Sequence, residues 1–161
     1  MSPADRLVIR PGRPDDLDVL VELGRRYCEA DGHDFHEART RQAFARLMAE
    51  PRWGTVLVAE LDSAAVGYAV VTSGYSIESG GPDALLDEIY LDVRGEGLGS
   101  TLLQRVLDEA RRWGASRLFL ETEAANERAR AFYLRHRFHQ EDSIWLSIDL
   151  DVDDRPDPAG S

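Results

Sequence analysis

The sequence has little cysteine and no long apolar run, and each absence excludes a class of protein. Cys28 is the only cysteine among 161 residues, so no internal disulfide can form, and a cytoplasmic location is expected. No apolar run is long enough to cross a bilayer, and the first residues lack the apolar core of a secretion signal. We therefore expect no membrane association.

Basic charge is also scarce, with 19 basic against 30 acidic side chains and a formal net charge of −11. A nucleic-acid partner is not expected, because phosphate backbones require clustered basic residues. An acidic surface favours cationic substrates such as amines, or serves solubility alone. Residues 151–161 form an acidic tail that we expect to be disordered. Residues 1–150, in a chain that is 43% hydrophobic, are long enough for a single domain.

The hydrophobic pattern predicts strands mixed with helices. Strands are expected at Leu7–Arg10, Thr55–Leu61, Val66–Thr72, Leu86–Leu91, Arg117–Glu121 and Ile144–Leu150. Helices are expected at about Leu17–Ala30, Glu37–Glu50, Leu98–Ala110 and Asn126–His136. The polar segment Ser73–Ala84 is expected to be a loop.

The stretch Leu86–Ala110 organises the rest of the chain. A short apolar strand turns on three glycines, Gly95, Gly97 and Gly99, into a helix with an apolar stripe. Such a turn leaves the first N–H groups of the helix without partners and directs the positive end of its dipole outward. The sequence therefore predicts that this turn holds a phosphate or pyrophosphate.

Spacing distinguishes three kinds of phosphate-binding turn. A P-loop needs a lysine before its serine or threonine, but Gly99 precedes Ser100 here. A Rossmann fingerprint needs G-x-G-x-x-G after the first strand, whereas these glycines alternate and lie past the middle of the chain. The third pattern, R/Q-x-x-G-x-G/A, is matched by Arg94, Gly97 and Gly99. It resembles the acetyl-coenzyme A motif of the Gcn5-related N-acetyltransferases, the GNAT superfamily.

A second motif and the element order strengthen this resemblance. Asn126, Ala129, Tyr133 and Phe138 match the superfamily pattern N-x-x-A-x-x-x-Y-x-x-x-G-F, with Arg137 in place of the glycine. If that position is left-handed, the arginine costs about 1 kcal/mol. The resemblance implies an α/β (α+β) GNAT acyl-CoA N-acyltransferase fold. Its mixed central sheet would have about six to seven strands flanked by four helices.

The resemblance also implies acetyl-CoA as co-substrate, bound where the strands Leu86–Leu91 and Arg117–Glu121 splay apart. The pantetheine arm would pair with the backbone of the first strand, and the amides of the glycine turn would hold the pyrophosphate. The cofactor-binding residues implied in this way are Tyr90, Leu91, Val93, Arg94, Gly95, Glu96, Gly97, Leu98, Gly99, Ser100 and Asn126.

The implied reaction is the transfer of an acetyl group to a primary amine by direct attack. A base must first remove a proton from the ammonium group of the acceptor. The Leu91 N–H would stabilise the oxyanion, and the Tyr133 phenol would protonate the departing thiolate. A phenol with a pKa near ~10 suits that task. Alternatively, Tyr133 is a core aromatic beside Phe132.

Four carboxylates are candidates for the base: Glu88, Asp87, Glu78 and Glu121. Because side chains alternate along a strand, Asp87 and Glu88 are not expected to face the same side. The superfamily often uses a carboxylate at this point of its central strand, so we favour Glu88. The alternative is a structural carboxylate paired with an arginine or a backbone turn.

Glu78, His33 and Phe35 are the expected substrate-binding residues, while solvent-exposed loop positions are the alternative. His33, Asp34 and His36 lack further ligands at metal spacing, so no metal cofactor is expected. The expected acceptor is a small cationic amine, and a protein amino group is the alternative. A homodimer is possible, because superfamily members are often dimers.

The loop before the glycine turn departs from the family pattern. Only Asp92 and Val93 stand between Leu91 and Arg94, where the family commonly has about four residues. A shortened loop could shift the oxyanion donor or remove a phosphate contact. It leaves open an acyl-CoA-binding or regulatory protein without turnover.

Overall fold

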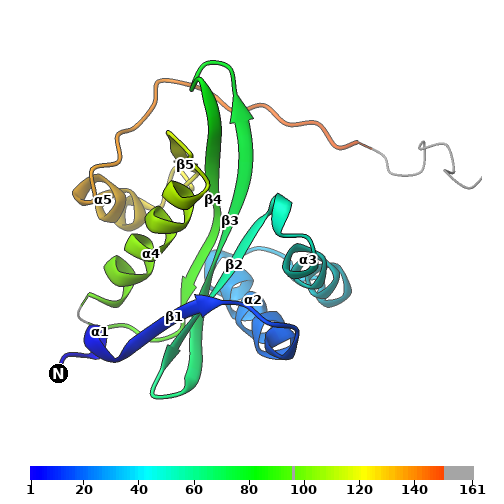
Figure 1. Cartoon of the computed structure of the whole chain (residues 1–161), viewed down its shortest axis with the longest axis vertical. Coiled ribbons are helices and arrows are strands. Elements are labelled where there is room, and N and C mark those ends of the chain that lie inside the picture. The colour runs from blue at the N-terminus through cyan, green and yellow to red at the C-terminus, as the bar shows by residue number, and fades with distance from the viewer. Residues whose placement is uncertain (96, 151–161) are drawn as a thin grey trace, which may run out of the picture. The chain divides into compact units, whose positions relative to one another are not determined.

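A computed structural model describes residues 1–95 and 97–150 of the chain. In these residues one sheet has the strand order β1-β2-β3-β4-β5 (Figure 1). The strands are β1 (Leu7–Pro11), β2 (Gly54–Leu61), β3 (Ala64–Ser76), β4 (Gly81–Leu91) and β5 (Leu118–Leu120). Successive neighbours are antiparallel except β4 and β5, which are parallel. A helix must therefore connect β4 to β5.

The described residues form five α-helices and two short 3-10 helices. They are α1 (Pro3–Arg6), α2 (Leu17–Asp31), α3 (Glu37–Ala49), α4 (Leu98–Arg112) and α5 (Glu127–Arg135), with short 3-10 helices η1 (Pro14–Asp16) and η2 (Pro51–Trp53). None of these helices has the length and apolar character that crossing a membrane requires.

The described chain separates into two compact units, residues 1–123 and residues from 124 onward. The first unit holds the whole sheet with α1 to α4, and the second holds α5. A single domain over residues 1–150 stays a prediction. The expected tail, residues 151–161, lies outside the described residues.

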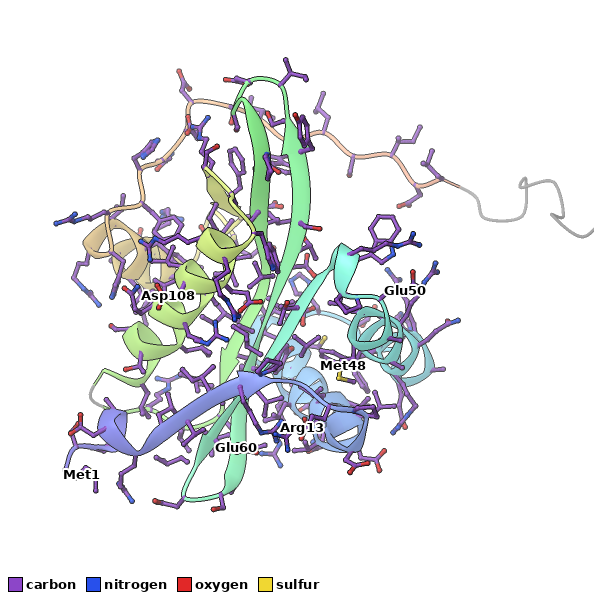
Figure 2. The ribbon with its side chains drawn as sticks, viewed as in Figure 1. Met1, Arg13, Met48, Glu50, Glu60 and Asp108 are labelled. Atoms are coloured by element: carbon purple, nitrogen blue, oxygen red, sulfur yellow. The ribbon has the colours of Figure 1, made fainter. Side chains whose placement is uncertain are left out.

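The first unit buries both faces of its sheet. On one face, α2 and α3 pack against β2 and β3, with Val58 and Tyr68 fully buried beneath Leu20 and Phe44. On the other face, α4 directs its buried side chains, Leu102 among them, at the sheet. Figure 1 shows α4 on the side of the sheet opposite to α2 and α3. Figure 2 accordingly labels Met48 of α3 and Asp108 of α4 on opposite sides. Because successive side chains of a strand point to opposite faces, the sheet contributes apolar residues to the core on both of its sides.

Two strand expectations were wrong. The sheet has five strands in the described residues, not six to seven, because Ile144–Leu150 forms no strand there. Its side chains are largely exposed, with Leu146 at 91%. An alternating pattern alone does not make a strand, since a strand also needs a neighbour for its backbone hydrogen bonds. The helix count differs too, because α1 makes five α-helices where four were expected.

The segment Ser73–Ala84, expected to be a loop, is the end of a long hairpin. β3 continues to Ser76 and β4 already begins at Gly81, with Ser76 opposite Gly81. Backbone pairing between β3 and β4 continues beyond their apolar residues into this polar segment. A polar composition therefore led to the wrong prediction of a loop.

Candidate active site

The turn between β4 and α4 is built around a glycine in the left-handed conformation. Gly97 has φ +81° and is the N-cap of α4, and as a glycine it has no side chain that could cap the helix. The Thr101 amide and hydroxyl both donate to the Gly97 carbonyl, at 2.9 and 3.1 Å. Leu98, 2% exposed, anchors the turn in the core. An uncapped helix start with its positive dipole end fits an anionic group. Arg94 is exposed beside it, and Glu96 lies outside the described residues.

The second half of β4 presents a backbone edge without a β5 partner. Among the described residues, β5 pairs only with Ala84–Leu86. Farther along, the Asp92 amide donates to the Val66 carbonyl at 2.8 Å, on the β3 side. Because amide directions alternate along an antiparallel strand, the Leu91 amide points away from β3. The edge Glu88–Leu91 is therefore the part of the strand that an extended ligand could pair with.

A β-bulge in β4 decides where the candidate base lies. Val71 is opposite Leu86 and Val70 is opposite Glu88, so Asp87 is an extra residue. Val70 belongs to the core cluster under α2 and α3, and Glu88 faces that side with it. The negative charge of Asp87 also reaches Glu88. The bulge interrupts the alternation of side chains between Leu86 and Glu88, and the expectation that Asp87 and Glu88 face different sides stays a prediction.

The Glu88 carboxylate is held by a buried phenol. The Tyr68 hydroxyl donates to Glu88 Oε2 at 2.7 Å, and Tyr68 itself is fully buried. Burial raises the pKa of Glu88, and the Asp87 charge raises it further, while the Tyr68 hydrogen bond lowers it. The net direction is upward. A carboxylate with a raised pKa is a better proton acceptor near neutral pH, as a general base requires.

Aromatic rings and one ion pair surround this carboxylate and fix the end of β4. The Tyr27 and Tyr90 rings meet edge to face with centroids 6.2 Å apart, and Tyr90 lies 6.4 Å from Tyr68. The Tyr90 hydroxyl donates to Asp92 Oδ1 at 3.1 Å, and Arg26 of α2 pairs with the same carboxylate. Asp92 thus ties the short loop before the glycine turn to α2.

Comparison with known protein families identifies the family of this chain. The sequence model described as the acetyltransferase (GNAT) family matches residues 19–138. That span includes the bulged strand, its open edge and the uncapped turn. The chain belongs to the GNAT acetyltransferase family. The resemblance found in the two sequence motifs is thereby confirmed.

Two relatives in the GNAT family are known as uncharacterised N-acetyltransferases. The first, from Mycobacterium bovis, is 34% identical over 97 residues, which cover 59% of this chain and 58% of the relative. This chain therefore spans less than two thirds of that relative's length. The second, from Archaeoglobus fulgidus, is 32% identical over 133 residues, covering 78% of this chain and 88% of the relative.

Solved structures share the GNAT fold. An integron cassette protein from the mobile metagenome of a salt marsh has a TM-score of 0.80 at 27% identity, covering 92% of each chain. A predicted acetyltransferase from Clostridium acetobutylicum, crystallised with acetyl-CoA, has a TM-score of 0.74 at 18% identity, covering 89% of this chain and 96% of its own. The expected fold class is thereby confirmed, although its strand count was too high.

The three expected substrate-binding residues lie in different segments of the first unit, and their role stays a prediction. Glu78 is exposed in the turn of the β3–β4 hairpin, and Val70, opposite Glu88, is six residues from Ser76 at that turn. This separation is roughly 20 Å along a strand. Phe35 is half-buried and packs against the core cluster that includes Tyr68.

His33 lies between two acidic side chains of the same unit. Its Nε2 is 3.1 Å from Asp31 and 3.7 Å from Glu123, and half of the side chain is exposed. This places the end of α2 near the segment after β5. Across residues 1–95 and 97–150, no group of three histidine, cysteine or acidic side chains is arranged to hold a metal ion.

The second GNAT motif folds as a capped helix within the second unit. Asn126 is the N-cap of α5, and its side chain accepts from the Ala129 amide at 3.0 Å. Tyr133 packs its ring against Phe138, with centroids 5.4 Å apart. Burial raises the pKa of Tyr133 to about 12. The phenol is thus protonated at neutral pH but is a weaker acid than the free phenol assumed from the sequence.

Sequence reasoning missed Tyr68, the residue that contacts Glu88 directly. Tyr68 and Val70 are two residues apart in the strand pattern, which already indicated that they share a buried face of β3. Nothing in the sequence indicated that the bulge at Asp87 would bring the Glu88 carboxylate to its hydroxyl. That contact depends on the register between two strands.

Proposed function

We propose that this protein is an N-acetyltransferase that moves an acetyl group from acetyl-CoA to a primary amine by direct attack. The observation that carries the proposal is the half-buried Glu88 carboxylate, on the strand that leads into the uncapped turn at Gly97. Membership of the GNAT family supports it, as does the Clostridium structure with acetyl-CoA. A cytoplasmic location stays a prediction from the single cysteine.

The chain offers two backbone features that suit coenzyme A. The edge of β4 at Tyr90 and Leu91, continued by Val93, would pair with the amide groups of the pantetheine arm. Backbone amides from Gly95 to Gly99, together with the Ser100 hydroxyl, would hold the pyrophosphate at the start of α4. When bound, the cofactor supplies the activated acetyl group. Asn126 in the cofactor site stays a prediction, since its side chain already caps α5.

In the proposed reaction the protons and electron pairs balance without a further reactant. Glu88 accepts a proton from the acceptor's ammonium group, directly or through water. The free amine then attacks the thioester carbon, and the Leu91 amide stabilises the oxyanion. The C–S bond breaks, and the Tyr133 phenol gives its proton to the thiolate. The second proton lost by the attacking nitrogen restores the phenol, and the proton on Glu88 passes to water. The amide product and free coenzyme A leave.

A covalent acetyl-cysteine would be the alternative to direct attack. Cys28 is the only cysteine, on α2, and burial raises the pKa of its thiol, with smaller contributions from the Glu88 and Asp31 charges. A thiol with a raised pKa is mostly protonated at neutral pH and is a poor nucleophile. This favours direct transfer in a single complex.

The proposed acceptor is a small cationic amine. Asp87 lies next to Glu88 on β4 and its charge raises the pKa of Glu88, and the chain as a whole is strongly acidic. Both features attract a positively charged substrate. Glu78, His33 and Phe35 as substrate-binding residues stay predictions, and so does a homodimer.

Two alternatives differ in measurable ways. A protein N-acetyltransferase would modify a peptide amino group instead of a small amine. A GNAT-fold acyl-CoA-binding or regulatory protein would bind acetyl-CoA without turnover, which the two-residue loop Asp92–Val93 keeps open.

The deciding experiment measures thiol release from acetyl-CoA in the presence of a panel of polyamines, aminoglycosides, amino acids and peptides. The chain contains no lysine, so acetylation of its own side chains cannot imitate turnover. We expect release with at least one small polycationic amine, and its loss in Glu88→Gln. Release with peptides alone would replace the small-amine acceptor by a protein one. Binding of acetyl-CoA without release for any amine would contradict the proposal.

A further inference from the structure

Tyr68 is the one side chain that donates a hydrogen bond to the proposed base among the described residues. It stands on β3 directly opposite Tyr90 and next to the Glu88 position, with a hydroxyl-to-carboxylate distance of 2.7 Å. None of its surface is exposed, and its ring meets the Phe44 ring edge to face at 5.4 Å. Packing on all sides leaves the ring no freedom to turn away. Because the phenol has a single orientation, its hydrogen bond holds the Glu88 carboxylate in a single orientation as well.

Several other ionisable groups face Glu88, and none of them replaces this contact. Tyr27 and Cys28 approach from α2, and Asp87 is the neighbour on the same strand. The Asp87 charge repels the Glu88 charge and raises its pKa. Tyr27 and Cys28 have raised pKa values themselves, so both are neutral near pH 7. Tyr68 is also neutral there, because burial raises its pKa, and it stays a donor throughout.

We propose that Tyr68 is a positioning residue that fixes the Glu88 carboxylate in the orientation from which it accepts the acceptor's proton. This role rests on the proposed function. The bond occupies Oε2, which leaves Oε1 as the oxygen for the substrate. The same bond stabilises the ionised carboxylate against the effects of burial and of Asp87.

The test replaces Tyr68 by phenylalanine, which keeps the ring and removes only the hydroxyl. Two quantities are measured against pH: kcat/KM for an accepted amine, and the ¹³C shift of the Glu88 carboxyl carbon, assigned by comparison with Glu88→Gln. Since a hydrogen bond to a charged group contributes about 1.5–3 kcal/mol, both midpoints should rise by about one pH unit or more in Tyr68→Phe. The KM for acetyl-CoA should stay unchanged, which a loosened fold would not allow.

Tyr27→Phe is the matched control, because it removes a hydroxyl from the same cluster and should leave the Glu88 midpoint in place. An unchanged or lowered Glu88 midpoint in Tyr68→Phe overturns the proposal, and so does a shifted carboxyl titration with an unshifted kinetic midpoint. If the wild type acetylates no amine, the proposed function fails and the role of Tyr68 in the reaction is overturned with it. The carboxyl titration then separately decides whether the Tyr68 contact exists in solution.

Discussion

At the scale of single residues, Glu88 combines a chemical role with a cost in stability. The folded protein favours its protonated form, because burial and Asp87 raise the pKa above the ordinary 4.5. Such a group stabilises the fold at low pH, and that contribution is lost as the pH rises through the folded pKa. Strained or unfavourable groups of this kind are typical of functional sites.

Glu88→Gln should therefore have opposite effects on activity and stability. Turnover should fall by about 10²- to 10⁴-fold, since general base catalysis contributes that much. Stability to urea should increase at pH 8 relative to wild type, because glutamine cannot ionise, and the difference should vanish below about pH 4. Urea titrations at both pH values test this. A variant that is less stable than wild type at pH 8 would show that the ionised carboxylate is structurally favourable.

Tyr133 carries the second residue-scale prediction. Tyr133→Phe should lower turnover by about 10²-fold with little change in the Kd for acetyl-CoA, because only protonation of the thiolate is lost. Steady-state kinetics and isothermal titration calorimetry measure the two quantities. Unchanged turnover would assign Tyr133 to packing against Phe132 and Phe138, consistent with its raised pKa.

The sequence provided candidate residues for the chemistry but not their contacts. Glu88 and the glycines of the turn were candidates from local motifs, and their roles stay predictions. The phenol of Tyr68 and the bulge at Asp87 could not, because they depend on how β3 and β4 pair. Phe35 packs against the core cluster, and its role in the substrate site stays a prediction, since apolar character alone does not distinguish a core residue from a pocket residue.

At the scale of elements, α5 ends in a cap whose left-handed position is occupied by an arginine instead of a glycine. The Phe138 amide donates to the Tyr133 carbonyl and the Arg137 amide to that of Leu134, which is a Schellman motif. Arg137 has φ +68°, so the left-handed conformation anticipated at this position is present. A side chain with Cβ is unfavourable there, and glycine is the residue that suits it.

Arg137→Gly should therefore raise the free energy of unfolding by about 1 kcal/mol. Ala131→Gly, in an exposed position inside the same helix, is the control and should lower it by a similar amount. Both are measured by denaturant unfolding. A destabilised Arg137→Gly variant would show that the arginine side chain makes a contact worth more than the backbone strain.

The elements with strong local signals were predicted well, and those that depend on partners were not. β2, α2, α4 and β5 appear close to their expected bounds, and Gly114 follows the end of α4 in the left-handed conformation. α1 was missed, although Ser2 and Asp5 form a capping box that was visible in the sequence. The segment Ile144–Leu150 had the pattern of a strand but no partner among the described residues.

At the scale of the whole molecule, binding of coenzyme A should stabilise the fold by mass action. At 100 times its Kd, acetyl-CoA should add about 2.7 kcal/mol and raise Tm, whereas NAD and ATP should leave Tm unchanged. Thermal unfolding with each ligand tests this. A shift with NAD alone would indicate a dinucleotide site.

Two glycine variants separate backbone strain from cofactor binding. Gly97→Ala and Gly114→Ala each place a Cβ at a left-handed end of α4, with no clash in the described residues. Both should lower Tm without ligand by similar amounts. Only Gly97→Ala should weaken acetyl-CoA binding. Equal binding by both variants would contradict a role for the turn.

The most direct test of the central claim is a crystal structure of the chain with coenzyme A. We predict the diphosphate within hydrogen-bond distance of backbone amides between Gly95 and Gly99, with the pantetheine arm along the edge of β4. The Leu98 amide already donates to the Gly95 carbonyl at 3.5 Å, so the other amides of the turn should make the contacts. A diphosphate bound elsewhere would contradict the account.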